Sequence, residues 1–285
     1  MKNITEYVKN NIFKLNYYFL MTFSTFCVSI IGVIVMFFMT KDNIPEGLGF
    51  ATFDITHLAW LLMGLILCLA AIFTYRKMNN KNRTIMRTVL GIAIIFLEIL
   101  KNIVAMCQGV FSIGHLPFHL CGINILLIGF DLFKQTNTIR NFLYYLCIPG
   151  AMLALLFPNW TVLPCFNFSH IHSFVIHILL VMYPLLLVTS GEVKPNIKTM
   201  PKCILLLILM AIPIYFVNLL ANTNFMFLMD PESGNPLGIF EKYLGSHLWG
   251  FPVLLPIVMF LMYLPLFLFS RFKKKTPKEK ELTTV

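Results

Sequence analysis

The chain has 285 residues, of which 58% are hydrophobic and only 12% are charged. Soluble domains carry about 25% charged residues, so this composition excludes an ordinary soluble domain. The formal net charge is +10, but the basic residues stand in short segments between apolar runs, which argues against a nucleic-acid-binding surface. The composition predicts an all-α membrane protein whose helices are apolar all round.

Eight apolar runs are long enough to cross a bilayer, for which about 20 residues suffice. The runs are continuous and do not alternate with polar residues, which excludes a closed β-barrel. The predicted transmembrane helices cover residues 16–39, 56–75, 84–108, 116–133, 139–157, 169–190, 202–221 and 248–270. A short amphipathic helix is also expected at Leu237–Leu244, in the longest outer loop.

The basic residues predict the orientation of these helices, because cytoplasmic loops collect Lys and Arg. Most of the Lys and Arg residues fall near the N-terminus, in every second loop or in the C-terminal tail, whereas the opposite side holds only Lys41 and Lys242. Both termini are therefore expected in the cytoplasm. In this orientation all seven histidines lie toward the non-cytoplasmic side.

Several polar residues stand inside or at the outer ends of the predicted helices. An ionisable residue within a membrane costs roughly 2.5 to 3.5 kcal/mol on insertion scales and often marks a functional site. The candidate binding residues are His57, Glu98, Lys101, His119, His170, His172, Asn222 and Asn224. Glu98 and Lys101 are three residues apart on one helix face and can form an ion pair, either as a structural tie between helices or as part of a site.

The segment around Cys121 suggests thiol chemistry. Pro117 suits the first turn of a helix, which places Cys121 near a helix N-terminus, where the helix dipole and a nearby imidazolium lower a thiol pKa. His119 stands about 200° around the helix from Cys121, so a base for the thiol must come from another helix. We expect His177, the deepest histidine, with His172 as second choice. The alternative is that Cys121 only packs as a small hydrophobe.

Three stretches of the chain resemble one family, the YwaF-like integral membrane proteins of bacteria and their eukaryotic relative, transmembrane protein 164. They are Phe-Asp-Ile-Thr-His-Leu at 53–58, Leu-Pro-Phe-His-Leu-Cys at 116–121 and Asn-Thr-Asn-Phe-Met-Phe-Leu at 222–228. The resemblance implies a seven-helix core at 53–270. An additional helix and outer loop within 1–52 would precede this core, and a basic tail at 271–285 would follow it.

The resemblance also implies phospholipid acyl transfer through a cysteine and a histidine. Cys121 would accept the acyl group, and His177, or else His170 or His172, would be the base. Membrane lipids would be the partners, as a phospholipid or lysophospholipid substrate in a bacterial plasma membrane. No cofactor, metal or nucleic acid is implied. Acyl-CoA is found in the cytoplasm, whereas the predicted site opens to the other side of the membrane. A phospholipid is therefore the expected acyl donor.

Two other functions stay open. A non-enzymatic protein could bind a small solute, or couple its transport to protons, through an outward-facing polar cavity. In that case Glu98 and Lys101 would be indispensable and Cys121 replaceable. A zinc-dependent membrane hydrolase is the weaker alternative, because the His-x-His at 170–172 has no acidic partner at a ligand spacing and the cysteines lack Cys-x-x-Cys spacing.

Overall fold

The structure, a computed structural model, describes residues 29–231 and 237–275, with side chains up to residue 268. Every regular element in these ranges is a helix, which confirms the predicted all-α class. The α-helices of the core are α2 (Ile55–Lys77), α3 (Asn80–Cys107), α4 (Leu120–Phe133), α5 (Asn137–Phe142), α6 (Ile148–Leu156), α7 (Phe168–Thr189), α8 (Met200–Ala221), α9 (Leu237–Leu244) and α10 (Gly250–Lys275). The short helix expected at Leu237–Leu244 is present as α9.

Six helical segments in the described ranges are long and apolar enough to cross a membrane. They are Ile55–Lys77, Asn80–Cys107, Asn137–Leu156, Phe168–Thr189, Ile197–Ala221 and His247–Leu268, and the shorter apolar helix Leu120–Phe133 is a seventh run. They correspond to the last seven predicted transmembrane helices. The first predicted helix, 16–39, lies largely outside the described residues, so the total of eight and the cytoplasmic termini stay predictions.

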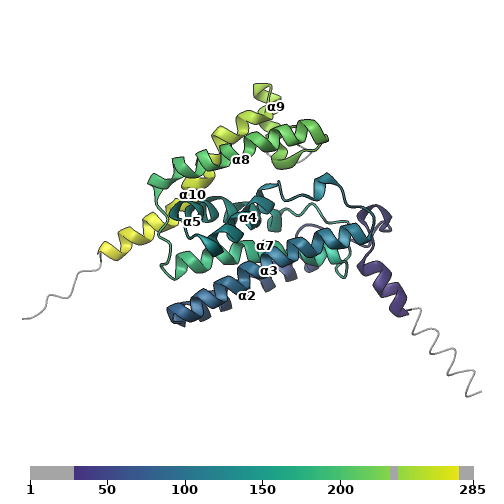
Figure 1. The fold of residues 1–285 in the computed structure, drawn as a ribbon, viewed down its shortest axis with the longest axis horizontal. Coiled ribbons are helices and arrows are strands. Elements are labelled where there is room, and N and C mark those ends of the chain that lie inside the picture. Colours follow the sequence, from purple (N-terminus) through teal and green to yellow (C-terminus); the bar gives the residue numbers. More distant parts are fainter. Residues whose placement is uncertain (1–28, 232–236, 276–285) are drawn as a thin grey trace, which may run out of the picture. The chain divides into compact units, whose positions relative to one another are not determined.

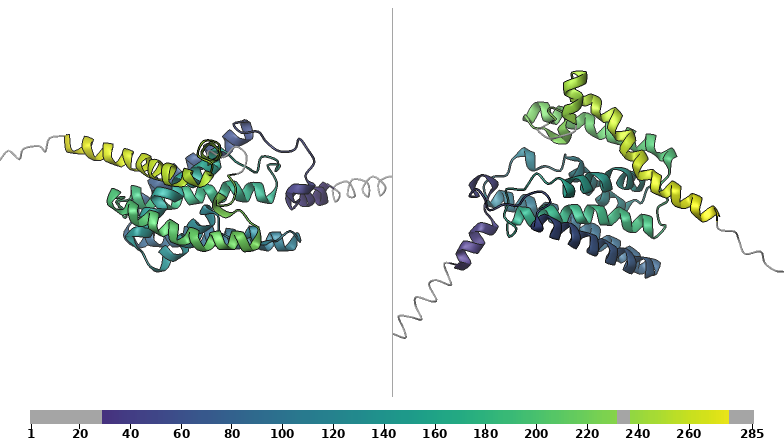
Figure 2. Two further views of the ribbon diagram at one scale, coloured as in Figure 1. Left: turned by 90° about the horizontal axis from the view of Figure 1, so that it is seen from above. Right: turned by 180° about the vertical axis from the view of Figure 1, so that it is seen from behind.

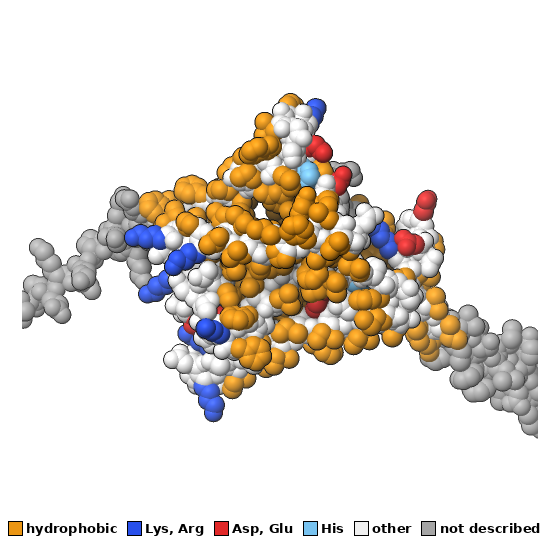
Figure 3. Space-filling model, turned by 45° about the horizontal axis from the view of Figure 1, so that its top comes forward, with side chains coloured by type: hydrophobic (Ala, Val, Ile, Leu, Met, Phe, Trp, Pro, Cys, Tyr) orange, Lys and Arg blue, Asp and Glu red, His pale blue; other side chains and the backbone are white. Residues whose placement is uncertain are grey.

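The surface fits a bilayer environment. On the face that Figure 3 shows, hydrophobic side chains cover a broad area, and most of the visible Lys and Arg side chains lie on the left, with others at the top and the right. Phe73, Ile92 and Phe216 are among the large apolar side chains that are more than half exposed. Exposed apolar area on this scale is what lipid contact requires of a helix.

The chain divides into two compact units. The smaller unit joins the described residues up to Phe50 to residues 160–171. There the backbone N–H of Phe50 donates to the carbonyl of Thr161 at 2.8 Å, and a Cβ on Gly49 would collide with the Thr161 carbonyl oxygen. The close approach of these two chain segments therefore requires glycine at position 49.

The larger unit contains residues 51–159 and 172 onward. Figures 1 and 2 show α2, α3 and α7 side by side. Gly64 of α2 lies against Ile178 of α7, and Gly91 of α3 lies against Leu132 of α4. Small residues at helix contacts let backbones approach closely, which matters in a bilayer because van der Waals packing drives helix association there.

The segment between α5 and α6, Leu143–Cys147, is wound as a π-helix, and all five of its residues are buried. Pro149 follows within α6. Proline lacks an N–H and crowds the carbonyl four residues earlier, so the wider π turn accommodates it. The Tyr144 hydroxyl donates to the Met262 carbonyl of α10 at 2.8 Å, and the Cys147 thiol donates to the Leu180 carbonyl of α7 at 3.3 Å. The π segment thus joins α10 to α7.

Candidate functional site

Five of the predicted site residues lie on the three helices α3, α4 and α7. Lys101 Nζ donates to Glu98 Oε1 at 2.5 Å, and both side chains are largely shielded from solvent. The charge of Glu98 acts on Cys121, and Lys101 and His177 both act electrostatically on His172. We call Glu98, Lys101, Cys121, His172 and His177 the cysteine cluster.

Cys121 is the second residue of α4 and is partly exposed. Its predicted place near a helix N-terminus agrees with the structure, but α4 begins at Leu120 and Pro117 precedes the first turn. His119 is the N-cap residue, and its Nδ1 accepts from the Met226 N–H at 3.4 Å. The His119 ring therefore supports the loop after α8 and leaves the thiol to groups on other helices.

The two histidines of the cluster are held in defined orientations. His177 Nδ1 lies 2.6 Å from the Ser173 carbonyl of its own helix. A carbonyl can only accept, so Nδ1 carries the proton and Nε2 carries the lone pair of the neutral ring. His172 Nε2 lies 3.2 Å from the Leu97 carbonyl of α3, which makes Nδ1 its basic nitrogen. His177 thus has the tautomer that a general base requires.

His57 is fully buried and serves the start of α2. Its Nδ1 accepts from the Phe53 N–H at 2.8 Å, and its Nε2 donates to the Leu155 carbonyl at 2.7 Å. Asp54 caps the helix, and hydrogen bonds from the backbone amides of His57 and Ala51 lower the pKa of its carboxyl. The 53–58 motif is therefore explained by helix capping and by the tie between α2 and α6.

His170 belongs to the smaller unit. Its Nδ1 lies 3.1 Å from the Leu163 carbonyl, and its ring packs edge-on against Phe50 with centroids 4.9 Å apart. Among residues 29–231 and 237–275, no group of three or more His, Cys, Asp or Glu side chains is arranged to hold a metal ion.

Asn222 and Asn224 shape the loop that follows α8. Asn222 ends the helix in the left-handed conformation with φ of 50°, which asparagine tolerates better than most residues. Asn224 Oδ1 accepts from the Met229 and Asp230 amides at 3.1 Å. Asn218, one turn before the end of α8, accepts from the Phe225 N–H at 2.9 Å. The side-chain amides of Asn218 and Asn224 thus hold this loop in place, which gives the 222–228 motif a structural role.

A second buried polar group was not recognised in the sequence. Arg140 binds Asp131 through two nitrogens, with Nε–Oδ1 at 2.8 Å and Nη2–Oδ2 at 3.2 Å. The Tyr183 hydroxyl donates to Asp131 Oδ2 at 2.9 Å, and Asp131 is fully buried. The signal in the sequence for this group is Asp131, an ionisable residue inside the predicted transmembrane helix 116–133.

A neighbouring ion pair completes this group. Arg87 Nη1 lies 2.5 Å from Glu192 Oε2, and the Tyr75 hydroxyl donates to Glu192 Oε1 at 2.7 Å. Arg87 also acts electrostatically on Tyr183. The six residues of this arginine cluster are Tyr75, Arg87, Asp131, Arg140, Tyr183 and Glu192. They join the ends of α2, α3, α4 and α7 on the side that the sequence predicts to be cytoplasmic.

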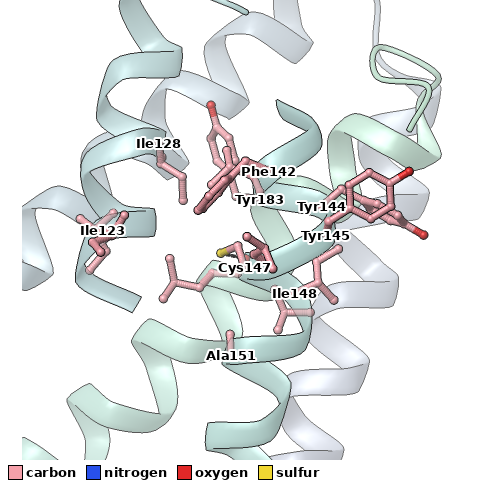
Figure 4. Close-up of a cluster of buried hydrophobic side chains, with 14 of the residues drawn as sticks. Ile123, Ile128, Phe142, Tyr144, Tyr145, Cys147, Ile148, Ala151 and Tyr183 are labelled. Atoms are coloured by element: carbon pink, nitrogen blue, oxygen red, sulfur yellow. Dashed lines mark hydrogen bonds between the residues drawn. The ribbon is translucent and has the colours of Figure 1, made fainter. Parts of the chain in front are cut away.

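An apolar layer separates the two clusters. Ile94 of α3, Ile128 of α4 and Leu180 of α7 are fully buried, and each stands on its helix between a residue of one cluster and a residue of the other. Figure 4 shows Ile128 near Phe142 and Tyr183. Close-packed aliphatic side chains offer no polar partner for water or ions, so these three residues form an apolar layer between the two clusters.

A bundle of apolar helices around two buried polar clusters defines a multi-pass helical membrane protein. The model of the TMEM164 family matches residues 51–263, and the chain belongs to that family. This match confirms the resemblance found in the sequence. Among curated proteins and among solved structures, no match was found.

Proposed function

We propose that the protein is a membrane acyltransferase that moves a fatty acyl group between lipids, with Cys121 as nucleophile and His177 as base. The observation that carries the proposal is the cysteine cluster itself. It combines a partly exposed cysteine at a helix N-terminus with a histidine whose Nε2 is basic. A thiol and a nearby base are the requirements for forming an acyl-enzyme.

The reaction has two steps. In the first, the Cys121 sulfur attacks the ester carbonyl of a phospholipid while His177 Nε2 takes the thiol proton. The carbon–oxygen bond then breaks, and the departing lysolipid oxygen receives that proton. In the second, the hydroxyl of an acceptor lipid attacks the thioester, His177 takes its proton, and the carbon–sulfur bond breaks. The proton returns to the Cys121 sulfur, so the enzyme is regenerated.

The ion pair of Glu98 and Lys101 supports this chemistry electrostatically. A bare carboxylate beside Cys121 would repel the negative sulfur that develops during attack. Lys101 neutralises Glu98 at 2.5 Å and removes that repulsion. The orientation predicted from the basic residues opens the site toward the non-cytoplasmic leaflet, so a phospholipid of that leaflet is the donor in this proposal.

The apolar layer favours acyl transfer over the alternative of solute or proton-coupled transport. Transport through the bundle needs polar groups along the whole path. Here Ile94, Ile128 and Leu180 are all fully buried between the clusters. A site that is reached from one face is sufficient for a lipid substrate.

Replacement of Cys121 tests the proposal. In reconstituted liposomes, Cys121→Ala is expected to lose acyl transfer between lipids and the acyl adduct seen by intact-protein mass spectrometry. His177→Ala is expected to slow transfer by about 10²- to 10⁴-fold. Cys203→Ala is the matched control, because Cys203 is also an interior cysteine and its thiol donates to the Thr138 carbonyl at 3.8 Å. Full activity of Cys121→Ala, with loss of function in Glu98→Gln and Lys101→Met, would instead support the transport alternative.

A further inference from the structure

Helix α9 has two apolar flanks, and the structure buries only one of them. Leu237 is 6% exposed, and a Cβ on Gly250, the first residue of α10, would meet the side chains of Leu237 and Phe240. Ile239 and Tyr243 are four residues apart and share the other flank. They are 59% and 73% exposed, so the described part of the chain leaves this flank uncovered.

The remaining arc of α9 is polar. Successive residues of a helix are rotated by about 100°, which places Gly238, Glu241 and Lys242 together on a side that neither apolar flank occupies. Glu241 and Lys242 are exposed, and the Lys242 ammonium lies 5.5 Å from the centre of the Tyr243 ring. A helix of this pattern suits the boundary between water and an apolar phase.

The chain holds α9 close to a membrane-spanning segment. The 3₁₀ turn His247–Trp249 packs against α9 and leads directly into α10, and Figures 1 and 2 show α9 beside the start of α10. The segment His247–Leu268 is long and apolar enough to span a membrane, and almost none of it is buried within the structure. Trp249, at the junction, is 58% exposed, and tryptophan favours the headgroup level of a bilayer.

Lipid fits the uncovered flank better than water or a second copy of the chain does. Exposure to water would forfeit the hydrophobic free energy of Ile239 and Tyr243. A stable protein interface takes about 20 to 30 residues from each partner, and one flank of an eight-residue helix is far smaller. We propose that α9 is an interfacial helix, which inserts Ile239 and Tyr243 into the bilayer at the headgroup boundary. This proposal is independent of acyl transfer.

The charges of α9 decide which lipid is required. Glu241 and Lys242 carry opposite charges and are the charged residues of the helix, so α9 has no net attraction to anionic headgroups. Insertion of the apolar flank then provides the binding, and zwitterionic phosphatidylcholine is sufficient. The long apolar stem of Lys242 lets its ammonium reach the phosphate level while the ring of Tyr243 stays below it.

Fluorescence quenching at two positions of α9 tests the proposal. The full-length protein is placed in phosphatidylcholine nanodiscs, and the emission of each variant is compared with that of the wild type to isolate the added indole. Tyr243→Trp puts an indole on the uncovered flank. Gly238→Trp is the matched control, because five positions along a helix correspond to about 140° and a Cβ on Gly238 would meet nothing within 4 Å.

The two indoles should respond to different quenchers. Lipids brominated near the headgroup end of the acyl chain should quench the indole of Tyr243→Trp about threefold more strongly than that of Gly238→Trp, and aqueous iodide should show the reverse order. Replacing part of the phosphatidylcholine with phosphatidylglycerol should leave both results unchanged. Ile239→Trp should behave as Tyr243→Trp does, and it takes the place of that variant if Tyr243→Trp fails to fold.

Three results would overturn the proposal. Equal quenching of Tyr243→Trp and Gly238→Trp by iodide would place the uncovered flank in water. Shielding of Tyr243→Trp from both iodide and brominated lipid would place it against protein, as in a dimer. Quenching by brominated lipid that requires phosphatidylglycerol would show that the charge of Lys242, and not the apolar flank, holds the helix at the membrane.

Discussion

Asp131→Ala is expected to destabilise the protein by about 3–5 kcal/mol. The substitution leaves Arg140, which is itself buried, without the carboxylate that binds two of its nitrogens. An unpaired buried cation is far more costly than the loss of one hydrogen bond. Tyr183 loses its acceptor as well. Denaturant titration in mixed micelles would measure the loss, with Tm in bicelles as a second readout.

Two companion variants make this prediction specific. Lys134→Met removes a cation from the same loop, but Lys134 is exposed, so its effect should stay within about 0.5 kcal/mol. The double variant Asp131→Leu with Arg140→Met should recover most of the stability, because apolar replacement of both partners is often neutral. A double variant as unstable as Asp131→Ala would show that the cost arises from packing and not from the unpaired charge.

Gly122→Ala should have the second-largest effect and should disturb the cysteine cluster directly. A Cβ at this position would lie 2.5 Å from the Cα and carbonyl carbon of Pro117. Backbone atoms cannot rotate away as a side chain can, so α4 or the preceding turn must shift. We expect a loss of about 1–3 kcal/mol, the usual cost of overpacking. Altered labelling of the adjacent Cys121 by a thiol reagent would report the shift.

Gly129→Ala provides the control within the same helix. A Cβ there would meet only the end of the Ile95 side chain, at 3.2 Å, and that side chain can adjust. Alanine is also favoured over glycine inside a helix by about 1 kcal/mol. The two Gly→Ala substitutions should therefore change the free energy of unfolding in opposite directions. Equal destabilisation at both positions would show that α4 tolerates no added volume anywhere.

The sequence predicted the local features of the candidate site. The ion pair of Glu98 and Lys101 could be anticipated because residues three apart share a helix face, and the structure contains it at 2.5 Å. The place of Cys121 near a helix start could be anticipated from the proline before it. The pairing of Cys121 with His177 in catalysis stays a prediction, since it concerns a reaction and not a contact.

Other residues could not be interpreted without the fold. His57 carries the same imidazole group as His177, yet the structure uses His57 to hold the start of a helix. Asn224 likewise holds a loop. The contact of Tyr183 with Asp131 joins residues 52 positions apart. No periodicity within one helix indicates such a partner.

The sequence by itself determined that this protein is helical, that it spans a membrane several times and where most of its helices lie. These properties follow from the free energy of transferring about 20 consecutive residues into a bilayer. This free energy is a sum over neighbouring residues, so it can be obtained from the sequence of one segment. Only the tertiary structure decided which polar side chains share a cluster and that an apolar layer divides the two clusters. That grouping depends on the rotation and crossing of helices, which are set by packing between residues far apart in the chain.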